Sequence, residues 1–449
     1  MSDDKVQPLR PPRSSRLSGF YRQTPEQRRV RLVESRWLSP EDAEACARLG
    51  GFDEACADSM VENVIGLHGL PLGLALNFVL NGQERLVPMA VEEPSIIAAA
   101  SYAARLCAEG GGFEVTADEP ITTAQVQLLD VPSLREAEAW LRERAGELIA
   151  EANTHLGPMC ARGGGVRDME VRVLDATTLV VHLHVDTRDA MGANLVNGLA
   201  ERMAPRIATL TGGRPGLKIL TNLADRRKVY VRALVPASAL VSEGFADGGL
   251  VRDAILEAQR FAELDPYRAV THNKGVMNGV DGVLVACGND WRAVEAGAHA
   301  WAARSGVYRP LTSWREGPEG ELVGLLEMPL ATSTVGGAAR THPGVLRALK
   351  LAGVTGAMDL AGLAAAAGLA TNLAALKALS TDGIQKGHMA LHARRIAAEA
   401  GASGEWVSLV AEQLSRERVF RPERAREILE ALRRESGANE APLQEGAFQ

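Results

Sequence analysis

Residues 265–290 read DPYRAVTHNKGVMNGVDGVLVACGND, and the interpretation of the remaining chain depends on them. They place a cation, several amides and a carboxylate among glycines. Lys274 falls in HNKG, and Asp290 follows an apolar run, residues 283–286, that predicts a buried strand. A carboxylate at the end of such a strand can keep a lysine charged and oriented toward a developing oxyanion. The alternative is a solvated loop lysine with an unrelated helix-capping aspartate.

The composition is that of a large globular protein. The chain has 449 residues, of which 46% are hydrophobic and 23% are charged, and its formal net charge is −7. This length allows about three domains. The modest negative charge disfavours a polyanionic partner, so we expect no nucleic acid to bind.

The cysteines and the apolar stretches bear on the compartment. Five cysteines are scattered without CxxC spacing, which argues against a disulfide framework or a zinc ribbon and fits a reducing cytoplasm. Residues 1–16 predict a loose arm without the apolar core of a signal peptide. Residues 360–379 are apolar but interrupted by glycines, Asn372 and Lys377. That pattern predicts a buried helix, and we expect no membrane anchor.

Local patterns predict early helix starts and a hairpin. Thr24 and Ser39 each place a capping hydroxyl before a proline at the first helical position. Asn81–Gly82 separates two alternating runs, residues 74–80 and 84–91, and predicts a two-residue β-hairpin turn.

The chain order predicts an α+β fold with an inserted domain at residues 121–235. Its expected elements are strand 122–129, helix 133–153, strands 168–174 and 178–187, helix 191–210 and strand 217–223. This β-α-β-β-α-β order is ferredoxin-like, the split β-α-β arrangement. Residues 1–120 and 236–381 form the surrounding large mixed α/β domain. Residues 382–449 form a helical C-terminal segment whose glycines suit a hinged flap.

A possible nucleotide site lies at residues 189–194, DAMGAN, where a strand gives way to a helix. Free backbone amides at that helix N-terminus could hold a pyrophosphate. The pattern is not GxGxxG and no Rossmann unit surrounds it, so the motif alone is weak. Residues 163–165, three glycines, fit either a flexible loop or a close backbone approach.

Several polar residues also have ordinary structural explanations. Glu92 and Glu93 precede a predicted helix, where the macrodipole stabilises negative charge. Arg22 fits a solvated surface arginine. His388 and His392 are four apart on a predicted helix, but the HExxH glutamate and a third ligand are missing. Surface or core histidines therefore explain the pair better than zinc does.

Five stretches carry a family resemblance. They are ENVIGLHGLPLGLALNF (62–78), VPMAVEEPSIIAAAS (87–101), RDAMGANLVN (188–197), THNKGVMNGVDGVLVACGNDWRAVEAGAHA (271–300) and GIQKGHMALHAR (383–394). Together they resemble 3-hydroxy-3-methylglutaryl-coenzyme A (HMG-CoA) reductase of class II, the bacterial soluble type, over about residues 15–435.

The resemblance implies a set of site residues. The implied catalytic residues are Glu93, Lys274, Asp290 and His388. The implied substrate contacts are Ser95, Arg268, Asn278, Asn372 and Arg22. The implied cofactor contacts are Asp189, Met191, Gly192, Asn194, His155, Arg162 and Asn222. In this scheme Arg268 holds the free carboxylate of the substrate, and Arg22 contacts the coenzyme A phosphates.

The reaction implied by the resemblance is reduction of HMG-CoA to mevalonate and coenzyme A by NADPH or NADH, or its reverse. Lys274, held by Asp290, would stabilise and protonate each oxyanion. Glu93 would share a proton with the lysine, and His388 would protonate the departing thiolate. No metal is expected, because the lysine serves as the electrophile.

Cofactor choice and assembly complete the expectations. Residues 153–162 contain no acid to accept a hydrogen bond from a ribose 2′-hydroxyl, which favours NADPH over NADH. The resemblance implies a site at a dimer interface, and we expect a homodimer assembled further into a hexamer, a trimer of dimers.

Two alternatives are a different coenzyme A-linked oxidoreductase on the same scaffold and a non-enzymatic ligand-binding relic. Arg268 and Lys274 argue against the first alternative. The presence of Glu93, Asp290 and His388 argues against the second.

Overall fold

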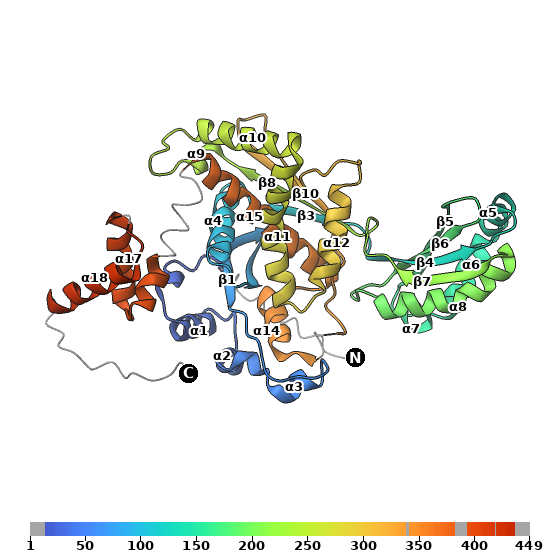
Figure 1. Ribbon diagram of the computed structural model, residues 1–449, viewed down its shortest axis with the longest axis horizontal. Coiled ribbons are helices and arrows are strands. Elements are labelled where there is room, and N and C mark those ends of the chain that lie inside the picture. The colour runs from blue at the N-terminus through green and yellow to red at the C-terminus, as the bar shows by residue number, and fades with distance from the viewer. Residues whose placement is uncertain (1–13, 338–340, 382–392, 418, 436–449) are drawn as a thin grey trace, which may run out of the picture. The chain divides into compact units, whose positions relative to one another are not determined.

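The computed structural model describes residues 14–337, 341–381, 393–417 and 419–435 (Figure 1). The chain divides into two compact units. The first comprises Met1–Glu92 with Ile96–Leu376, and the second comprises Glu93–Ser95 with Lys377–Gln449. His388, His392 and most of the expected N-terminal arm lie outside the described residues.

A six-stranded mixed sheet forms the centre of the first unit. Its strand order is β2-β1-β3-β8-β10-β9. The strands are β1 (Leu72–Leu80), β2 (Gln83–Ala90), β3 (Phe113–Ala117), β8 (Lys228–Val235), β9 (Thr312–Glu316) and β10 (Leu322–Pro329). Only the β1–β3 pair among these is parallel, and the other neighbours are antiparallel.

The hairpin and the first helix starts confirm the local predictions. Leu80 pairs with Gln83, and both turn residues between them have positive φ, 47° at Asn81 and 76° at Gly82. A two-residue turn of this kind matches the right-handed twist of its strands. Thr24 forms a full capping box with Gln27. Ser39 accepts a hydrogen bond from the backbone of Asp42.

Helices cover the six-stranded sheet. The longer ones are α4 (Ile96–Ala108), α10 (Gly248–Leu264), α11 (Pro266–Ala286), α12 (Trp291–Ala302), α14 (Pro343–Ala352) and α15 (Ala357–Ser380). The shorter ones are η1 (Phe20–Arg22), α1 (Pro25–Glu34), α2 (Pro40–Cys46), η2 (Leu49–Gly51), α3 (Glu54–Asp58) and α9 (Ala237–Leu240).

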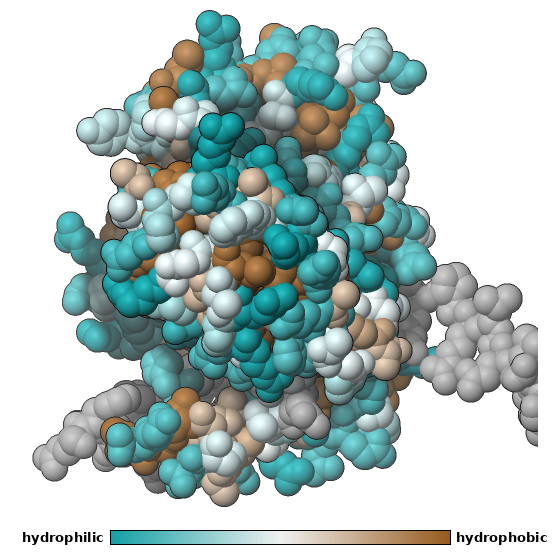
Figure 2. Space-filling model, turned by 90° about the vertical axis from the view of Figure 1, so that its right-hand side faces the viewer, coloured by the Kyte–Doolittle hydropathy of each residue, from teal (hydrophilic) through white to brown (hydrophobic). Residues whose placement is uncertain are grey.

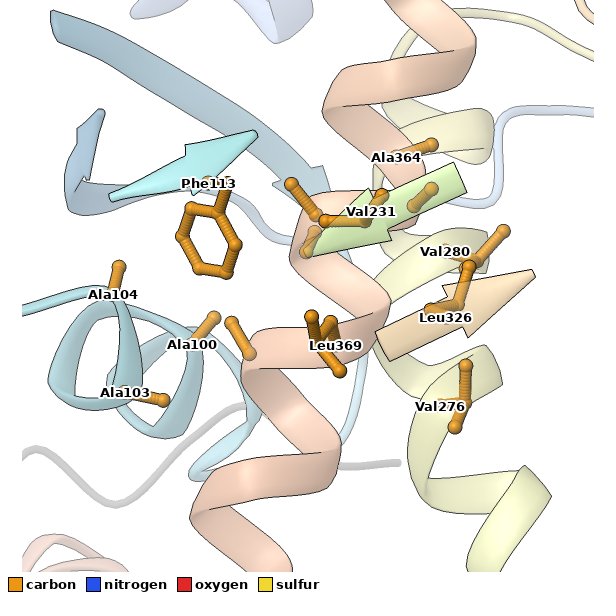
Figure 3. Packing of buried hydrophobic residues seen from close by; sticks show 14 of the residues in the cluster. Ala100, Ala103, Ala104, Phe113, Val231, Val276, Val280, Leu326, Ala364 and Leu369 are labelled. Carbon is orange, nitrogen blue, oxygen red and sulfur yellow. The ribbon is translucent and has the colours of Figure 1, made fainter. Parts of the chain in front are cut away.

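Helix α15 runs through the main hydrophobic core. Ala364 and Leu369 of this helix pack between α4, α11 and the strands β3, β8 and β10 (Figure 3). The helix is long and apolar enough to cross a membrane by length and composition. However, 89% of its most apolar 18-residue window is buried inside the protein. This burial confirms the predicted core helix.

Helix α11 corrects the prediction of a loop followed by a strand. Asp265 caps it with its carboxylate, and Pro266 occupies its first turn. The predicted strand, residues 283–286, is its last turn. The glycines that suggested a loop instead permit close packing of two helices. A Cβ on Gly279 would lie 2.3 Å from the carbonyl oxygen of Ala367 in α15.

A four-stranded antiparallel sheet forms the inserted part. Its order is β5-β6-β4-β7, and its connections run β-α-β-β-α-β along the chain. The strands are β4 (Ile121–Leu129), β5 (Gly165–Val173), β6 (Leu179–Asp186) and β7 (Arg214–Leu220). The helices are α5 (Leu134–Glu143), α6 (Ala145–Thr154), α7 (Gly157–Cys160) and α8 (Ala193–Thr211).

Two details of the inserted part differ from expectation. The single helix expected over 133–153 breaks at Arg144, whose ψ of 13° lies outside the helical range. The expected domain range, 121–235, also includes β8. That strand pairs with β3 and β10 of the six-stranded sheet, and its register with both is continuous. The four-stranded sheet therefore ends at Leu220.

The second unit contains α17 (Glu405–Glu417) and α18 (Pro422–Glu435), and residues 393–399 are also helical. These helices agree with the predicted helical C-terminal segment. They share a small apolar core that includes Val410, Leu414 and Leu429. Figure 2 shows one face of the molecule, on which hydrophobic residues form small groups among hydrophilic ones.

Candidate active site

Helix α11 positions three of the predicted site residues. Lys274 is exposed, and Asn278 lies one turn later on the same side of the helix. The neighbouring side carries Gly275 and Gly279, which face α15. Arg268 is half-buried one and a half turns before Lys274, and burial lowers the pKa of its guanidinium. Lys274 therefore extends from a rigid helix and not from a loop.

Asp290 begins α12 and caps it. Its Oδ1 accepts a hydrogen bond from the Ala293 amide at 3.1 Å, and Arg292 Nε lies 3.5 Å from the same oxygen. The alternative of a helix-capping aspartate is therefore confirmed for this carboxylate. Capping does not by itself exclude a second role, because a carboxylate has several acceptor positions.

Helix α11 separates Lys274 from Asp290 within one chain. The amide of Asn289 donates to the carbonyl of Leu284 at 2.9 Å, so Asp290 stays at the C-terminal end of α11. Ten residues of helix separate Lys274 from Leu284, a rise of ~15 Å. In a helix each Cα–Cβ bond also tilts toward the N-terminus, away from the end that carries Asp290.

Asn372 lies in a buried polar network and not at a surface. It is 1% exposed, and its Oδ1 accepts from Trp314 Nε1 at 2.8 Å and from the Thr312 hydroxyl at 3.1 Å. Its Nδ2 donates to His272 Nε2 at 3.0 Å. Burial, aided by the charge of Arg268, lowers the pKa of His272 to about 3. The network thus holds a neutral His272 two residues before Lys274.

Glu93 and Ser95 lie in the turn before α4. Ser95 has a φ of 80°, in the left-handed region that is rare for a residue with a side chain. Its hydroxyl oxygen is buried and has no hydrogen-bond partner within the described residues. Backbone strain of this kind persists where the surroundings require it and often occurs at functional sites. Arg22, in contrast, is exposed and donates to the Tyr21 hydroxyl at 3.0 Å.

The 189–194 motif leads directly from β6 into α8. Gly192 is the N-cap of α8, with a φ of 90° and no side-chain capping bond, and Asn194 is exposed in the first turn. Asp189 is engaged elsewhere, because its Oδ1 accepts from the Ala357 amide at 2.8 Å at the start of α15. The first-turn amides of α8 thus receive no bond from a capping side chain, which suits an anion.

Met191 and Asn222 converge on one small cavity. Both line it together with Ala293 and Val294 of α12. Gly297 makes this approach possible, because a Cβ there would lie 2.6 Å from the carbonyl oxygen of Asn222. The structure therefore brings two predicted cofactor residues to the helix that Asp290 begins.

Two arginines that we did not predict support this region. Arg227 is fully buried and donates to Thr187 Oγ1 and to the carbonyls of Ala190 and Thr332. Burial lowers its pKa to about 10, while Asp186 and Asp189 act in the opposite direction. Arg188 donates to the carbonyl of Gly163 at 2.6 Å. The sequence feature that could have indicated Arg227 is the pair of arginines at positions 226 and 227 in a connecting segment.

The expected cofactor-specificity stretch surrounds α7. His155 and Arg162 are both exposed. Glycine 164 packs against the chain that leads into α8, since a Cβ there would lie 2.6 Å from the carbonyl oxygen of Asp186. The stretch is therefore held beside Arg188. Arg162 and Arg188 border the same loop. Residues 163–165 are a close backbone approach, one of the two alternatives that the sequence left open.

Comparisons with known proteins agree with one another. The hydroxymethylglutaryl-coenzyme A reductase family model matches residues 25–393. The 3-hydroxy-3-methylglutaryl-coenzyme A reductase of Archaeoglobus fulgidus is 44% identical over 424 residues, 94% of this chain and 95% of that protein. The reductase structure from Streptococcus pneumoniae has a TM-score of 0.79 at 38% identity, covering 93% of this chain and 99% of that chain.

A second similar solved structure contains a bound ligand. It is the class II reductase from Streptococcus pneumoniae bound to NADPH in open conformations, with a TM-score of 0.78 at 38% identity. It covers 81% of this chain and 99% of that chain. The family match, the long archaeal alignment and the common fold all point the same way. The chain belongs to the hydroxymethylglutaryl-coenzyme A reductase family, oxidoreductases that reduce HMG-CoA to mevalonate.

Proposed function

We propose that the reduction takes place at a site shared by two copies of this chain. One copy supplies Lys274, and the other supplies Asp290 together with the cofactor residues near α12. The observation that carries the proposal is the length of α11 between Lys274 and Leu284, ~15 Å of helix. A twofold axis between two copies could bring Lys274 of one copy to the C-terminal end of α11 in the other, where Asp290 lies.

The surface beside Lys274 suits an interface. Four large apolar side chains are exposed where α10 gives way to α11, namely Phe261, Leu264, Tyr267 and Val270. Tyr267 retains 88% of its surface. Exposed apolar groups clustered in this way favour a protein–protein contact. We propose a homodimer through this surface, and assembly of three such dimers into a hexamer.

The proposed chemistry assigns one role to each catalytic residue. A bound nicotinamide cofactor supplies hydride. The Lys274 ammonium stabilises negative charge on the substrate oxygen, and Asp290 keeps that ammonium charged and oriented. Glu93 exchanges a proton with the lysine, while His388, outside the described residues, protonates the thiolate of coenzyme A. We assign His388 to the C-terminal segment, residues 382–449, acting as a flap.

The proposed substrate contacts extend this scheme. Arg268 pairs with the free carboxylate of the substrate, because a guanidinium binds carboxylates through two hydrogen bonds. Asn278 and Ser95 also bind the substrate. Arg22 contacts the coenzyme A phosphates.

Asn372 acts indirectly in this proposal. Its amide is bonded to Thr312, Trp314 and His272, so it steadies the turn of α11 that carries Lys274. It is therefore a positioning residue, and the expected direct contact with substrate remains a prediction.

The proposed cofactor site lies at the start of α8 in the four-stranded part. The first-turn amides near Gly192 and Asn194 bind the pyrophosphate. Arg162 and His155 meet a 2′-phosphate, and Arg188 adds positive charge beside the same loop. We therefore propose NADPH as the preferred cofactor, in a cytoplasmic enzyme whose residues need no metal for the reduction.

Subunit complementation tests the shared site. Lys274→Ala and Asp290→Ala should each abolish turnover. When the two variants are coexpressed and assemble at random, about a quarter of wild-type activity should return, because half of the dimers are mixed and each has one intact site. Failure of purified mixed dimers to recover activity would place both residues at a site within one copy.

A matched control excludes nonspecific rescue. The Lys274→Ala variant is coexpressed with a variant that lacks both Lys274 and Asp290. Neither chain of these mixed dimers carries Lys274, so they should remain inactive, and any activity would indicate nonspecific rescue.

Absorbance at 340 nm tests the reaction and cofactor choice. The wild-type chain should oxidise NADPH, and more slowly NADH, only when HMG-CoA is present. No oxidation of either cofactor would favour the relic alternative. Arg162→Ala should lower kcat/KM for NADPH by ~10-fold and leave that for NADH nearly unchanged, because only NADPH carries the 2′-phosphate. Equal losses with both cofactors would exclude a 2′-phosphate contact.

A further inference from the structure

The outer face of the four-stranded sheet gathers three metal-ligating side chains. Each of Glu170, His182 and His184 offers a ligand atom, and these atoms all lie within 4.8 Å of one another. The two histidines are two apart on β6, so their rings share one face of the strand. Glu170 on β5 is the direct cross-strand partner of His182. The opposite face of β6 carries Leu183 and its apolar neighbours in the core.

The histidine rings are buried and held in place. His184 is 3% exposed, and its Nδ1 lies 2.8 Å from the Thr123 hydroxyl. His182 is 8% exposed, and its Nε2 lies 2.9 Å from the Gln125 side-chain amide. Metal-binding histidines are typically oriented in this way by a hydrogen bond at the other ring nitrogen.

One buried ring nitrogen has no partner in this arrangement. His184 Nε2 is buried and has no hydrogen-bond partner within the described residues. It faces Glu170 Oε2 at 3.6 Å, which is too long for a hydrogen bond. A buried nitrogen without a partner is costly, and a cation between the nitrogen and the carboxylate would remove that cost.

A competing cation borders the cluster. Arg226 Nη2 lies 3.4 Å from Glu170 Oε2, but Nη1 makes the shorter contact, 2.8 Å, with Asp168. Arg226 is half-exposed, so it can keep Asp168 and release Glu170. Arg172, also on β5, is the other nearby cation. Binding of an ion would therefore exchange one arginine contact for three ligand bonds.

We propose that Glu170, His182 and His184 form a binding site for a divalent transition ion of the Zn²⁺ class. Two imidazoles and one carboxylate suit zinc, cobalt or nickel better than magnesium or calcium, which prefer oxygen ligands alone. Three protein ligands leave a fourth position for water. The ion would join β5 to β6. It is separate from the proposed reduction, since none of the proposed catalytic or cofactor residues belongs to it.

Metal titration of the full-length, untagged chain tests the site. After treatment with a chelator, wild-type protein should bind one Co²⁺ per chain, with visible d–d absorption bands that Zn²⁺ displaces. His184→Gln and Glu170→Gln should each weaken Co²⁺ binding by at least ~10²-fold, because each removes one of three ligands. Glu170 is exposed at the rim, so its variant should fold even if the buried His184 variant does not.

Two further variants distinguish this site from nonspecific binding. His299→Ala removes a different histidine, one paired with Glu295 at 2.5 Å, and should leave Co²⁺ binding unchanged. Arg226→Ala removes the competing cation and should strengthen binding by ~10-fold. The proposal is overturned if wild-type protein binds no Co²⁺ at micromolar concentrations, or if Glu170→Gln binds it as tightly as wild type.

Discussion

Two glycine-rich regions of this chain look alike as sequence and serve different purposes in the fold. In α11, Gly279 is helical, and its missing side chain lets the backbone of α15 approach. At the start of α8, Gly192 has a φ of 90°, a conformation that glycine adopts without the steric cost of a side chain. Gly279 is required by the close approach of α15, whereas Gly192 is required mainly by its own backbone conformation.

This difference separates residues that hold the fold together from residues that are proposed to bind or react. Along α11 the packing side holds Gly275 and Gly279, while Lys274 and Asn278 occupy the neighbouring side. At α8 the glycine is itself part of the proposed cofactor site, because it ends the strand-to-helix turn and leaves the first amides available. A substitution in α11 should therefore change either stability or activity, depending on the side of the helix. A substitution at the start of α8 should change both.

Replacing Lys274 should have the largest effect on turnover. Lys274→Ala removes the proposed electrophile from an exposed position, so we expect kcat to fall by ~10³-fold with little change in thermal stability. NADPH affinity, measured by fluorescence titration, should remain near that of wild type. Lys350→Ala, which removes another exposed lysine paired with Asp42, should keep full activity. Normal turnover of Lys274→Ala would refute the assignment of chemistry to this side of α11.

The packing side of α11 should respond to added volume. In Gly279→Ala the new Cβ would lie 2.3 Å from the Ala367 carbonyl oxygen, so α11 and α15 must move apart. We expect a loss of ~2 kcal/mol in the free energy of unfolding, measured by urea denaturation. Gly275→Ala is the matched control, since its nearest neighbour is Ala375 Cβ at 4.0 Å. That variant should gain up to ~1 kcal/mol from helix propensity. Equal losses in both variants would contradict the packing role.

The α8 region should behave differently. Gly192→Ala forces a side chain into the left-handed region and places its Cβ 2.5 Å from Thr187 Cγ2. We expect ~10-fold weaker binding of NADPH together with a modest loss of stability, ~1 kcal/mol. Gly198→Ala is the control in the same helix, because nothing lies within 4 Å of its Cβ position. Unchanged NADPH affinity in Gly192→Ala would remove this turn from the proposed cofactor site.

A half-buried acid should give the smallest effect and a pH dependence. Burial, with Glu295 nearby, raises the pKa of Asp281 from 3.8 to about 8, whereas the α8 region buries a cation, Arg227. The folded chain then binds more protons than the unfolded chain between these values, so its stability falls as pH rises through them. Asp281→Asn should flatten this decline in Tm. An identical pH profile in the variant would exclude Asp281 as its source.

Local patterns predicted much of the fold. The capping residues Thr24 and Ser39 act as expected, because a cap depends only on the neighbouring backbone. The alternating strands of the inserted part were predicted within a few residues. The failure was α11, where Gly275, Gly279 and Gly282 suggested a loop. A single sequence does not reveal that a neighbouring helix requires small residues.

The site was predicted unevenly for the same reason. Lys274 and Asp290 stood out as charged residues among glycines, whereas the 189–194 motif was weak by itself. Arg227 and the His272–Asn372 network did not, because their partners come from distant segments. Asn372 is 100 residues from His272 along the chain, and 58 from Trp314.

The amino-acid sequence by itself determined the caps, the hairpin and the order of helices and strands along the inserted part, since these follow from short-range periodicity and residue type. The tertiary structure alone decided that residues 283–286 continue a helix, that Asp290 caps α12 far from Lys274, and that two histidines and a glutamate meet on one sheet face. Those outcomes depend on contacts between segments that are distant in sequence, and such contacts arise only when the chain packs.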